Sequence, residues 1–360
     1  MPVLEGTDHV ELWVGNARQA AHFYRSAFGF DIVAYAGPET GMRDRSSYVL
    51  QQGHIRLVLT APLGPVGDIA EHVRLHGDGV RSIALLVEDA AAAYEAATTR
   101  GAQPVEEPHR LEDASGAVHT SAVATFGDTL HRFVERNGYS GPHLPGYRDD
   151  RRGGAGVGLR FVDHTVGNVE VGRMDPWVDW YHTVFNFDVF QEFDENDIAT
   201  QYSALRSKVT RDARTMITFP INEPAQGLKV SQIQEYLDFY RGPGVQHIAL
   251  HTDDVIDTVR RMRDSGVEFL TAPAAYYEEL APRAAEHGVS EDLDHLRDLG
   301  ILVDFEEDGY LLQIFTRPVG DRPTLFYEVI QRRGARGFGK GNFKALFEAI
   351  EREQAARGNL

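Results

Sequence analysis

The chain contains two copies of one sequence pattern, and this internal repeat constrains its fold more than any other feature. The matching segments are 8–9 with 163–164, 23–31 with 180–188, and 79–85 with 244–250. Gly, Pro, Arg and Asp cluster at residues 139–158, between the copies, as they do in linkers. Repeats in one order along a chain indicate repeated structural units. We therefore expect two homologous domains, residues 1–150 and 151–360.

Each copy alternates short apolar strands with amphipathic helices. Residues 245–250 form an apolar run, and Val255, Val259 and Met262 then recur at helical spacing before Gly266. Residues 90–99 provide the equivalent helix in the first copy, and helices are also expected near residues 15–28 and 172–185. The pattern predicts an α+β protein of four βαβββ units, which pair because one unit has too few strands to form a core. A final amphipathic helix is expected over residues 342–357.

Composition excludes several classes of protein. The chain has 360 residues, 42% of them hydrophobic, with 36 Lys+Arg against 54 Asp+Glu. A net charge of −18 disfavours nucleic-acid binding. The absence of cysteine excludes disulfides and thiolate sites and is compatible with a reducing compartment. No signal peptide or membrane-spanning run is expected. We predict a cytoplasmic protein that binds neither nucleic acid nor membranes.

Differences between the copies indicate where chemistry takes place. His164 has a counterpart in His9, whereas His247 stands where the first copy has Ser82. Because the two histidines open equivalent strands of paired units, pseudo-symmetry is expected to bring them face to face. The second copy also has Glu328 on a late, otherwise apolar strand. A His, His, Glu set on three strands is therefore expected only in the second copy.

The counterpart of Glu328 is Phe133 or Arg132, depending on a gap of one residue, and neither is a carboxylate. An ionised carboxylate on an apolar strand needs a strong partner. Two imidazoles and one carboxylate on one face leave coordination positions open, as in non-haem Fe(II) oxygenases. The set predicts a metal site.

Five motifs in order give the chain a specific resemblance over essentially its whole length. They are Phe219–Ala225 (FPINEPA), Ser231–Tyr236 (SQIQEY), Gly244–Ala249 (GVQHIA), Gly309–Phe315 (GYLLQIF) and Gly337–Phe347 (GFGKGNFKALF). In these motifs the chain resembles the 4-hydroxyphenylpyruvate dioxygenase family of the vicinal oxygen chelate superfamily. The resemblance implies that superfamily's fold, with the four units paired into two open-barrel domains and a C-terminal helix. It also implies that His164, His247 and Glu328 bind Fe(II).

The implied reaction converts 4-hydroxyphenylpyruvate and O2 to homogentisate and CO2, by oxidative decarboxylation, ring hydroxylation and side-chain migration, in tyrosine and phenylalanine catabolism. Because the keto acid supplies the electrons, no nicotinamide or flavin is needed. The family positions that match near the substrate are Ser207, Asn222, Gln232, Phe315, Phe338 and Phe343. Ser207 and Asn222 are also expected to act in catalysis, together with Gln246 and Gln313 beside the ligands. Glycines before the last helix suit a hinge, so this helix is expected to form a lid.

Several alternatives stay open. A 4-hydroxymandelate synthase would share the fold, metal and substrate but would hydroxylate the benzylic carbon. The run Pro220–Pro224 and Phe315 resemble the ring-hydroxylating enzyme more closely. A non-catalytic small-molecule-binding protein of the same superfamily is a remoter alternative, because such proteins generally lack the complete ligand set. A glyoxalase-like isomerase would need a fourth protein ligand to its metal, and no second carboxylate is evident. A homo-oligomer, either a dimer or a tetramer, is expected.

Overall fold

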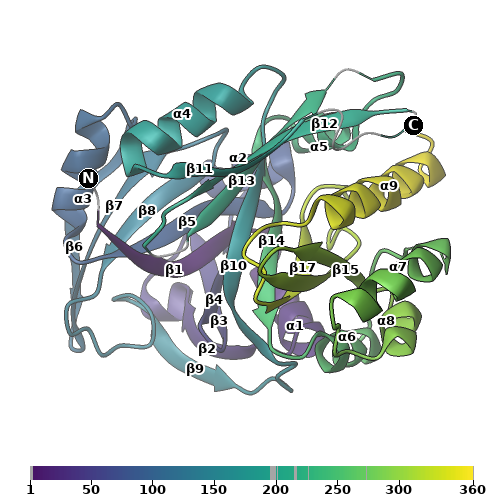
Figure 1. Cartoon of the computed structure of the whole chain (residues 1–360). Helices are drawn as coiled ribbons and strands as arrows, with labels where there is room; N and C mark the ends of the chain where they lie inside the picture. Colours follow the sequence, from purple (N-terminus) through teal and green to yellow (C-terminus); the bar gives the residue numbers. More distant parts are fainter. Residues whose placement is uncertain are drawn as a thin grey trace.

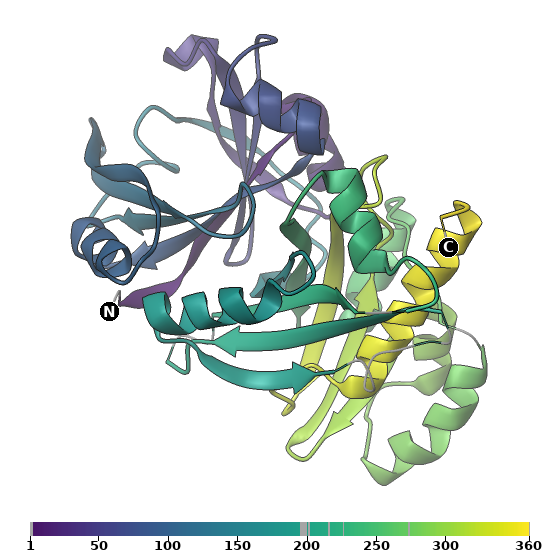
Figure 2. The same cartoon turned by 90° about the horizontal axis from the view of Figure 1, so that it is seen from above.

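The structure is a computed structural model, and it describes residues 3–194, 200, 202–214, 217–225, 227–272 and 274–359, apart from the side chains of 274, 275, 340 and 343. Two curled sheets, one from each copy of the repeat, pack side by side (Figures 1 and 2). Each copy supplies two βαβββ units, which confirms the predicted α+β fold.

The first half forms a sheet with the strand order β6-β7-β8-β5-β1-β4-β3-β2-β9. Its strands are β1 (Leu4–Trp13), β2 (Asp31–Ala36), β3 (Arg45–Gln52), β4 (Ile55–Pro62), β5 (Gly79–Val87), β6 (Pro104–Asp113), β7 (Gly116–Ala124), β8 (Leu130–Glu135) and β9 (Arg148–Arg152). Its α-helices are α1 (Ala17–Ala27), α2 (Asp68–His76) and α3 (Ala90–Thr99). Because β9 pairs with β2, this sheet ends just beyond the predicted boundary at residue 150. The division into separate domains stays a prediction.

The second half forms a sheet with the strand order β11-β12-β13-β10-β14-β17-β16-β15. Its strands are β10 (Leu159–Asn168), β11 (Asp188–Phe193), β12 (Ala204–Arg211), β13 (Thr218–Ala225), β14 (Gly244–Thr252), β15 (Leu302–Glu306), β16 (Gly309–Phe315) and β17 (Phe326–Arg333). Its helices are α4 (Met174–Phe185), α5 (Gln232–Tyr240), α6 (Val255–Asp264), α7 (Ala274–Glu286), α8 (Leu293–Leu299) and α9 (Lys340–Ala356). Helices α7 and α8 lengthen the connection that in the first half runs directly from α3 to β6.

Local sequence signals account for the helix ends. The Asp254 side chain accepts a hydrogen bond from the backbone N–H of Asp257 and so caps α6. Gly266 follows the end of α6 with a φ of +92°, a left-handed conformation that favours glycine. Both features agree with the helix predicted after residue 250.

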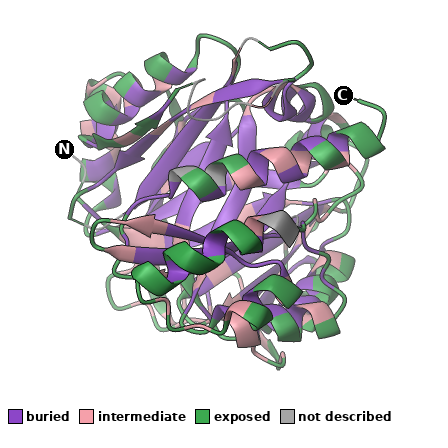
Figure 3. Cartoon of the chain, turned by 45° about the vertical axis from the view of Figure 1, so that its right-hand side comes forward, coloured by how far each residue is buried: buried purple, intermediate pink, exposed green. Residues whose placement is uncertain are grey.

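The two halves share one apolar core. Leu12 and Phe133 of the first half belong to the same buried cluster as Val245 of the second. Figure 3 shows the strands largely buried and the outer helix faces exposed. A Cβ at Gly127 would lie 2.2 Å from the Pro243 carbonyl oxygen, so the halves meet there at backbone distance. The relative placement of the halves is therefore set by continuous packing.

Among the described residues, no helix combines the length and apolar character needed to cross a bilayer.

Candidate metal centre

The predicted ligands lie on three adjacent strands, β10, β14 and β17. His164 and Glu328 both lie opposite Ala249 in the strand register, and His247 is two residues before Ala249 on the same face. The small Ala249 side chain leaves room between its neighbours. His164, His247 and Glu328 are buried, and one potential ligand atom from each lies within 4.8 Å of the others. The structure thus brings together the three side chains that the repeat comparison predicted.

The hydrogen bonds of the two imidazoles orient them toward Glu328. His164 Nδ1 lies 2.8 Å from Asp163 Oδ1, and His247 Nδ1 lies 2.9 Å from Gln246 Oε1. An acceptor at Nδ1 places the proton there and leaves a lone pair on Nε2. The Nε2 atoms of His164 and His247 lie 3.2 and 3.4 Å from Glu328 Oε2. Two nitrogen lone pairs therefore face a carboxylate oxygen that is also an acceptor. A proton or a metal cation between them removes this repulsion.

The electrostatics of the cluster favour a charged carboxylate. Burial would raise the pKa of Glu328, but the adjacent imidazoles hold this pKa at about 2. Burial disfavours the charged form of His164, yet Glu328 and Asp163 raise its pKa above the ordinary value. Burial lowers the pKa of His247 despite its contact with Glu328. The cluster therefore favours a charged carboxylate held between two imidazoles.

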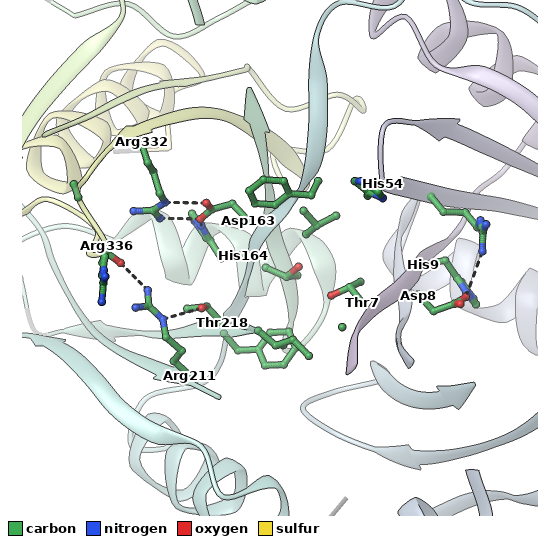
Figure 4. A pocket seen from close by; sticks show the side chains of 18 residues that line it. Thr7, Asp8, His9, His54, Asp163, His164, Arg211, Thr218, Arg332 and Arg336 are labelled. Carbon is green, nitrogen blue, oxygen red and sulfur yellow. Dashed lines mark hydrogen bonds and ion pairs between the residues drawn. The ribbon is translucent and has the colours of Figure 1, made fainter. Parts of the chain in front are cut away.

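Asp163 and Arg332 support His164, and the sequence analysis assigned them no role. Arg332 donates two hydrogen bonds of 2.8 Å to the Asp163 carboxylate, which in turn holds His164 (Figure 4). The repeated Asp-His dipeptide, Asp8-His9 in the first copy, was a signal that could have indicated this role. The Arg332 partner becomes apparent only in the tertiary structure.

The two predicted glutamines lie beside the ligands. Gln313 Nε2 donates a 2.8 Å hydrogen bond to Glu328 Oε1, and Gln246 contacts His247 as described above. The Asn342 amide, in the first turn of α9, lies 2.8 Å from Gln313 Oε1. A chain of contacts therefore links α9 to Glu328 through Gln313. Asn342 was not among the predicted site residues, because its neighbour Gln313 is distant along the chain.

The predicted polar substrate residues have unused hydrogen-bonding capacity. Ser207 on β12 and Asn222 on β13 are paired across the strands, and Asn222 Nδ2 donates to Asn168 Oδ1 at 3.3 Å. Among the described residues, no partner is found for Ser207 Oγ, Asn222 Oδ1, Gln232 Oε1 or Asn168 Nδ2, all of them buried. Unpaired buried polar atoms are costly, so each calls for an explanation, and binding of a polar ligand is one. Gln232 lies at the start of α5, and Asn168 is a further polar residue that the sequence analysis missed.

Two predicted aromatic residues contact the histidines. The Phe338 ring lies edge-on to His164, with ring centroids 4.7 Å apart, and Phe315 lies edge-on to His247 at 6.0 Å. Phe326, which was not predicted, stacks on His247 at 4.8 Å. The side chain of Phe343 lies outside the described part of the structure. On α9, Phe347 is buried in an apolar cluster with Phe338. The lid role of α9 stays a prediction.

The equivalent location in the first half holds an ion pair. The pairing of β5 with β8 matches that of β14 with β17 and places Arg132 at the position of Glu328, which resolves the gap left open by the sequence. Arg132 donates a 2.8 Å hydrogen bond to Glu106. Ser82 stands at the position of His247, and only His9 remains of the ligand set. A fixed cation thus occupies the location of the second half's carboxylate.

A cavity of about 440 Å³ lies between the starts of β1 and β10, with Asp163 and His164 on one side and Asp8 and His9 on the other (Figure 4). Its charged lining includes Arg56, Arg211, Arg332 and Arg336. None of the predicted polar substrate residues lines it. The cavity reaches one predicted ligand, His164, from the side of its Asp163 partner, and it differs from the predicted substrate site.

The chain matches known proteins in sequence and in fold. Residues 6–134 and 161–314 match the model of the Glyoxalase/Bleomycin resistance protein/Dioxygenase superfamily. The chain is 48% identical to a 4-hydroxyphenylpyruvate dioxygenase of Dictyostelium discoideum, over 99% of this chain and 100% of that one. It is 50% identical to that of Danio rerio, over 98% and 91%. A solved mutant of 4-hydroxymandelate synthase from Streptomyces coelicolor has a TM-score of 0.86 at 35% identity, over 98% of this chain and 100% of that one.

Proposed function

Since the chain belongs to the 4-hydroxyphenylpyruvate dioxygenase family of the glyoxalase superfamily and is a metal-dependent dioxygenase, we propose that it uses Fe(II) to convert 4-hydroxyphenylpyruvate and O2 to homogentisate and CO2. The observation that carries the proposal is the convergence of two imidazole Nε2 atoms on Glu328 Oε2 in a buried site.

The donor set fits iron. Two neutral imidazoles and one carboxylate on one face form the ligand type of non-haem Fe(II) enzymes. We assign His164, His247 and Glu328 as the ligands. A bound Fe(II) supplies positions for a keto acid and O2 and the oxidising chemistry, for which the keto acid provides the electrons. Asp163, Gln246 and Gln313 keep the ligand atoms oriented through the contacts described above.

The surrounding residues bind the substrate and exclude water. Ser207, Asn222 and Gln232 offer buried atoms that can hydrogen-bond the phenol of the substrate or the polar groups of an intermediate. Phe338 and Phe315 supply apolar surface beside the histidines for the aromatic ring, and Phe343 is assigned the same role from its family position. We assign to α9 the predicted role of a lid that limits access of water, which would otherwise divert reactive species. Fixing the ring position selects which carbon is hydroxylated.

The product formed from one substrate tests the proposal. Enzyme loaded anaerobically with Fe(II) and 4-hydroxyphenylpyruvate is exposed to a limiting amount of O2, and the products are separated by chromatography. We expect about one homogentisate and one CO2 for each O2 consumed. Parallel samples with Mn(II), Co(II) or Zn(II) test the identity of the metal, and Glu328→Gln serves as the inactive control. Absence of O2 consumption with iron would overturn the proposal.

A second function is favoured by one observation, the 4-hydroxymandelate synthase structure with a TM-score of 0.86. That reaction uses the same substrate but hydroxylates the benzylic carbon. The same assay distinguishes the two, because a synthase would yield 4-hydroxymandelate in place of homogentisate. The family relatives at 48% and 50% identity favour the dioxygenase.

We also propose a cytoplasmic homo-oligomer, either a dimer or a tetramer. The absence of cysteine suits a reducing compartment. Light scattering coupled to gel filtration measures the mass of the particle, and a mass of one chain would contradict the proposed assembly.

A further inference from the structure

A second cluster of potential metal ligands lies away from the centre described above, on the first half. His72 and His76 lie four residues apart on α2, and Asp128 lies in the turn between β7 and β8. Side chains four residues apart share one helix face. One potential ligand atom from each of the three residues lies within 4.8 Å of the others. The spacing therefore places two imidazoles and a carboxylate around one point.

His72 has no hydrogen bond that accounts for its burial. The residue is 3% exposed, and neither ring nitrogen has a partner among the described residues. Its ring lies 4.7 Å from that of His76 and edge-on to Trp13 at 5.4 Å. Burial lowers the pKa of His72 to about 3. A neutral imidazole at neutral pH keeps a lone pair for a cation.

His76 is oriented as metal-binding histidines are. Its Nδ1 lies 2.5 Å from the carbonyl oxygen of Tyr240, so the proton belongs on Nδ1. Its Nε2 then presents a lone pair to Asp128 Oδ2 at 2.9 Å. Two acceptors at this distance require a shared cation, which is either a proton on His76 or a metal ion. The orphaned nitrogens of His72 beside this pair favour the metal ion.

The surroundings leave the carboxylate available. Arg81 lies over the Trp13 ring, 4.6 Å from its centroid, and donates to the backbone carbonyl of Asp128. Arg81 therefore weakens binding of a cation through its charge without occupying the carboxylate. The Asp128 side chain is 52% exposed, which provides a path for an ion and for water as a further ligand.

We propose that His72, His76 and Asp128 form a second metal site, for a divalent transition metal of the zinc type. Nitrogen and carboxylate donors with a remaining position for water suit Zn2+. The site lies where the halves meet, because the Tyr240 carbonyl that orients His76 belongs to α5 of the second half. Arg322 of the second half donates a 2.6 Å hydrogen bond to the Leu75 carbonyl, next to His76. A bound ion would fasten α2 to the β7–β8 turn at this contact.

Metal stoichiometry tests the site separately from catalysis. Iron-loaded enzyme is equilibrated with Zn2+ by dialysis, and both metals are measured. We expect about one zinc per chain in addition to iron. His72→Phe, which keeps a ring against Trp13, and Asp128→Asn, at a half-exposed position, should each weaken zinc binding by at least tenfold while retaining iron and activity. His22→Phe, at an exposed histidine on another helix, should bind zinc like the parent.

Two further measurements exclude binding at the catalytic centre. Glu328→Gln, which should lose iron, is expected to retain one zinc that His72→Phe in the same background removes. Zinc should raise the melting temperature of the parent but not of Asp128→Asn, because an ion that binds only the folded state stabilises it. Equal zinc binding by the parent, His72→Phe and Asp128→Asn would overturn the proposal. No added zinc at micromolar concentrations would also overturn it and would assign the His76–Asp128 contact to a protonated ion pair.

Discussion

The two halves have the same strand order around their centres and yet hold different chemistry. In the second half, His164, His247 and Glu328 converge in a buried cluster. In the first half, His9 remains, but Arg132 stands at the position of Glu328 and pairs with Glu106 at 2.8 Å. The support of the histidine is retained in both halves. The shared strand order therefore does not determine metal binding, which depends on a few side chains carried by those strands.

The retained support shows which contacts serve the fold. Arg136 donates two hydrogen bonds to Asp8, as Arg332 does to Asp163, and Asp8 contacts His9. A buried carboxylate with a bidentate arginine is costly to disrupt whether or not a metal is present. The Asp-His-Arg group is therefore part of the structure that both halves share. In the second half it also orients a ligand.

The largest expected difference between the halves concerns Glu328 and Arg132. Glu328→Gln keeps the size of the side chain but removes the charge that Fe(II) requires, so iron affinity should fall at least ~100-fold, beyond the effect of changes outside the ligands. Activity should be lost. Arg132→Gln should leave iron content unchanged, because the equivalent location in its half keeps only His9 of the three predicted iron ligands. Iron analysis of both purified variants measures this, and normal iron binding by Glu328→Gln would refute the ligand assignment.

The next largest expected effect is a difference in iron binding between variants of Asp163 and Asp8. Asp163→Asn and Asp8→Asn should each destabilise the fold by about 3 kcal/mol, because each leaves a partly buried arginine without its charge partner. Only Asp163→Asn should also weaken iron binding, by about 10–100-fold. Denaturant unfolding and iron titration of both variants check this. Equal iron affinity in the two variants would show that Asp163 does not orient His164.

The stabilisation by Asp8 should depend on pH. Burial would raise the pKa of Asp8, but Arg136 and His9 hold it well below its ordinary value. A lowered pKa stabilises the fold above the pKa of the unfolded chain, about 3.9, and this stabilisation is lost as pH falls toward the folded value. The difference in unfolding free energy between the parent and Asp8→Asn should thus be constant near pH 7 and shrink below about pH 4. A difference independent of pH would assign it to packing.

A smaller effect is expected for the contact between α9 and the centre. Asn342→Ala removes the amide that contacts Gln313, which is worth about 1 kcal/mol, or roughly fivefold in iron affinity if it acts through Glu328. Product formed per O2 should decrease as well, because water enters more easily beneath a loosened helix. Lys344→Ala, an exposed change on the same helix, is the matched control. If both variants behave like the parent, α9 contributes packing alone.

The smallest effect is expected at Ser207. Its buried hydroxyl has no partner among the described residues, so Ser207→Ala should leave stability unchanged or slightly raised. If the hydroxyl binds substrate, KM should rise about fivefold. Thr210→Val on the same strand should lower stability and leave KM unchanged, because Thr210 donates a hydrogen bond of 2.9 Å to the Phe219 carbonyl. A normal KM for Ser207→Ala would remove this residue from the substrate site.

The repeat predicted most of the fold and the three candidate ligands, because duplicated segments reveal which polar residues one copy lacks. It could not align Glu328 with Arg132, since a gap of one residue is settled only by strand register. Contacts between distant segments, such as Asn342 with Gln313, could likewise not be predicted from the repeat. His72 and His76 are visible as a helical pair, but their proximity to Asp128 depends on where a turn packs.

The continuous core that joins the halves has a consequence for how such a molecule diversifies. Two identical subunits in a symmetric dimer are encoded by the same residues, so every substitution changes both sites together. When the copies are covalently joined and share one core, each position is specified separately. One copy is then free to become a passive scaffold, and the other to become chemically specialised, without either losing the partner surface on which it depends.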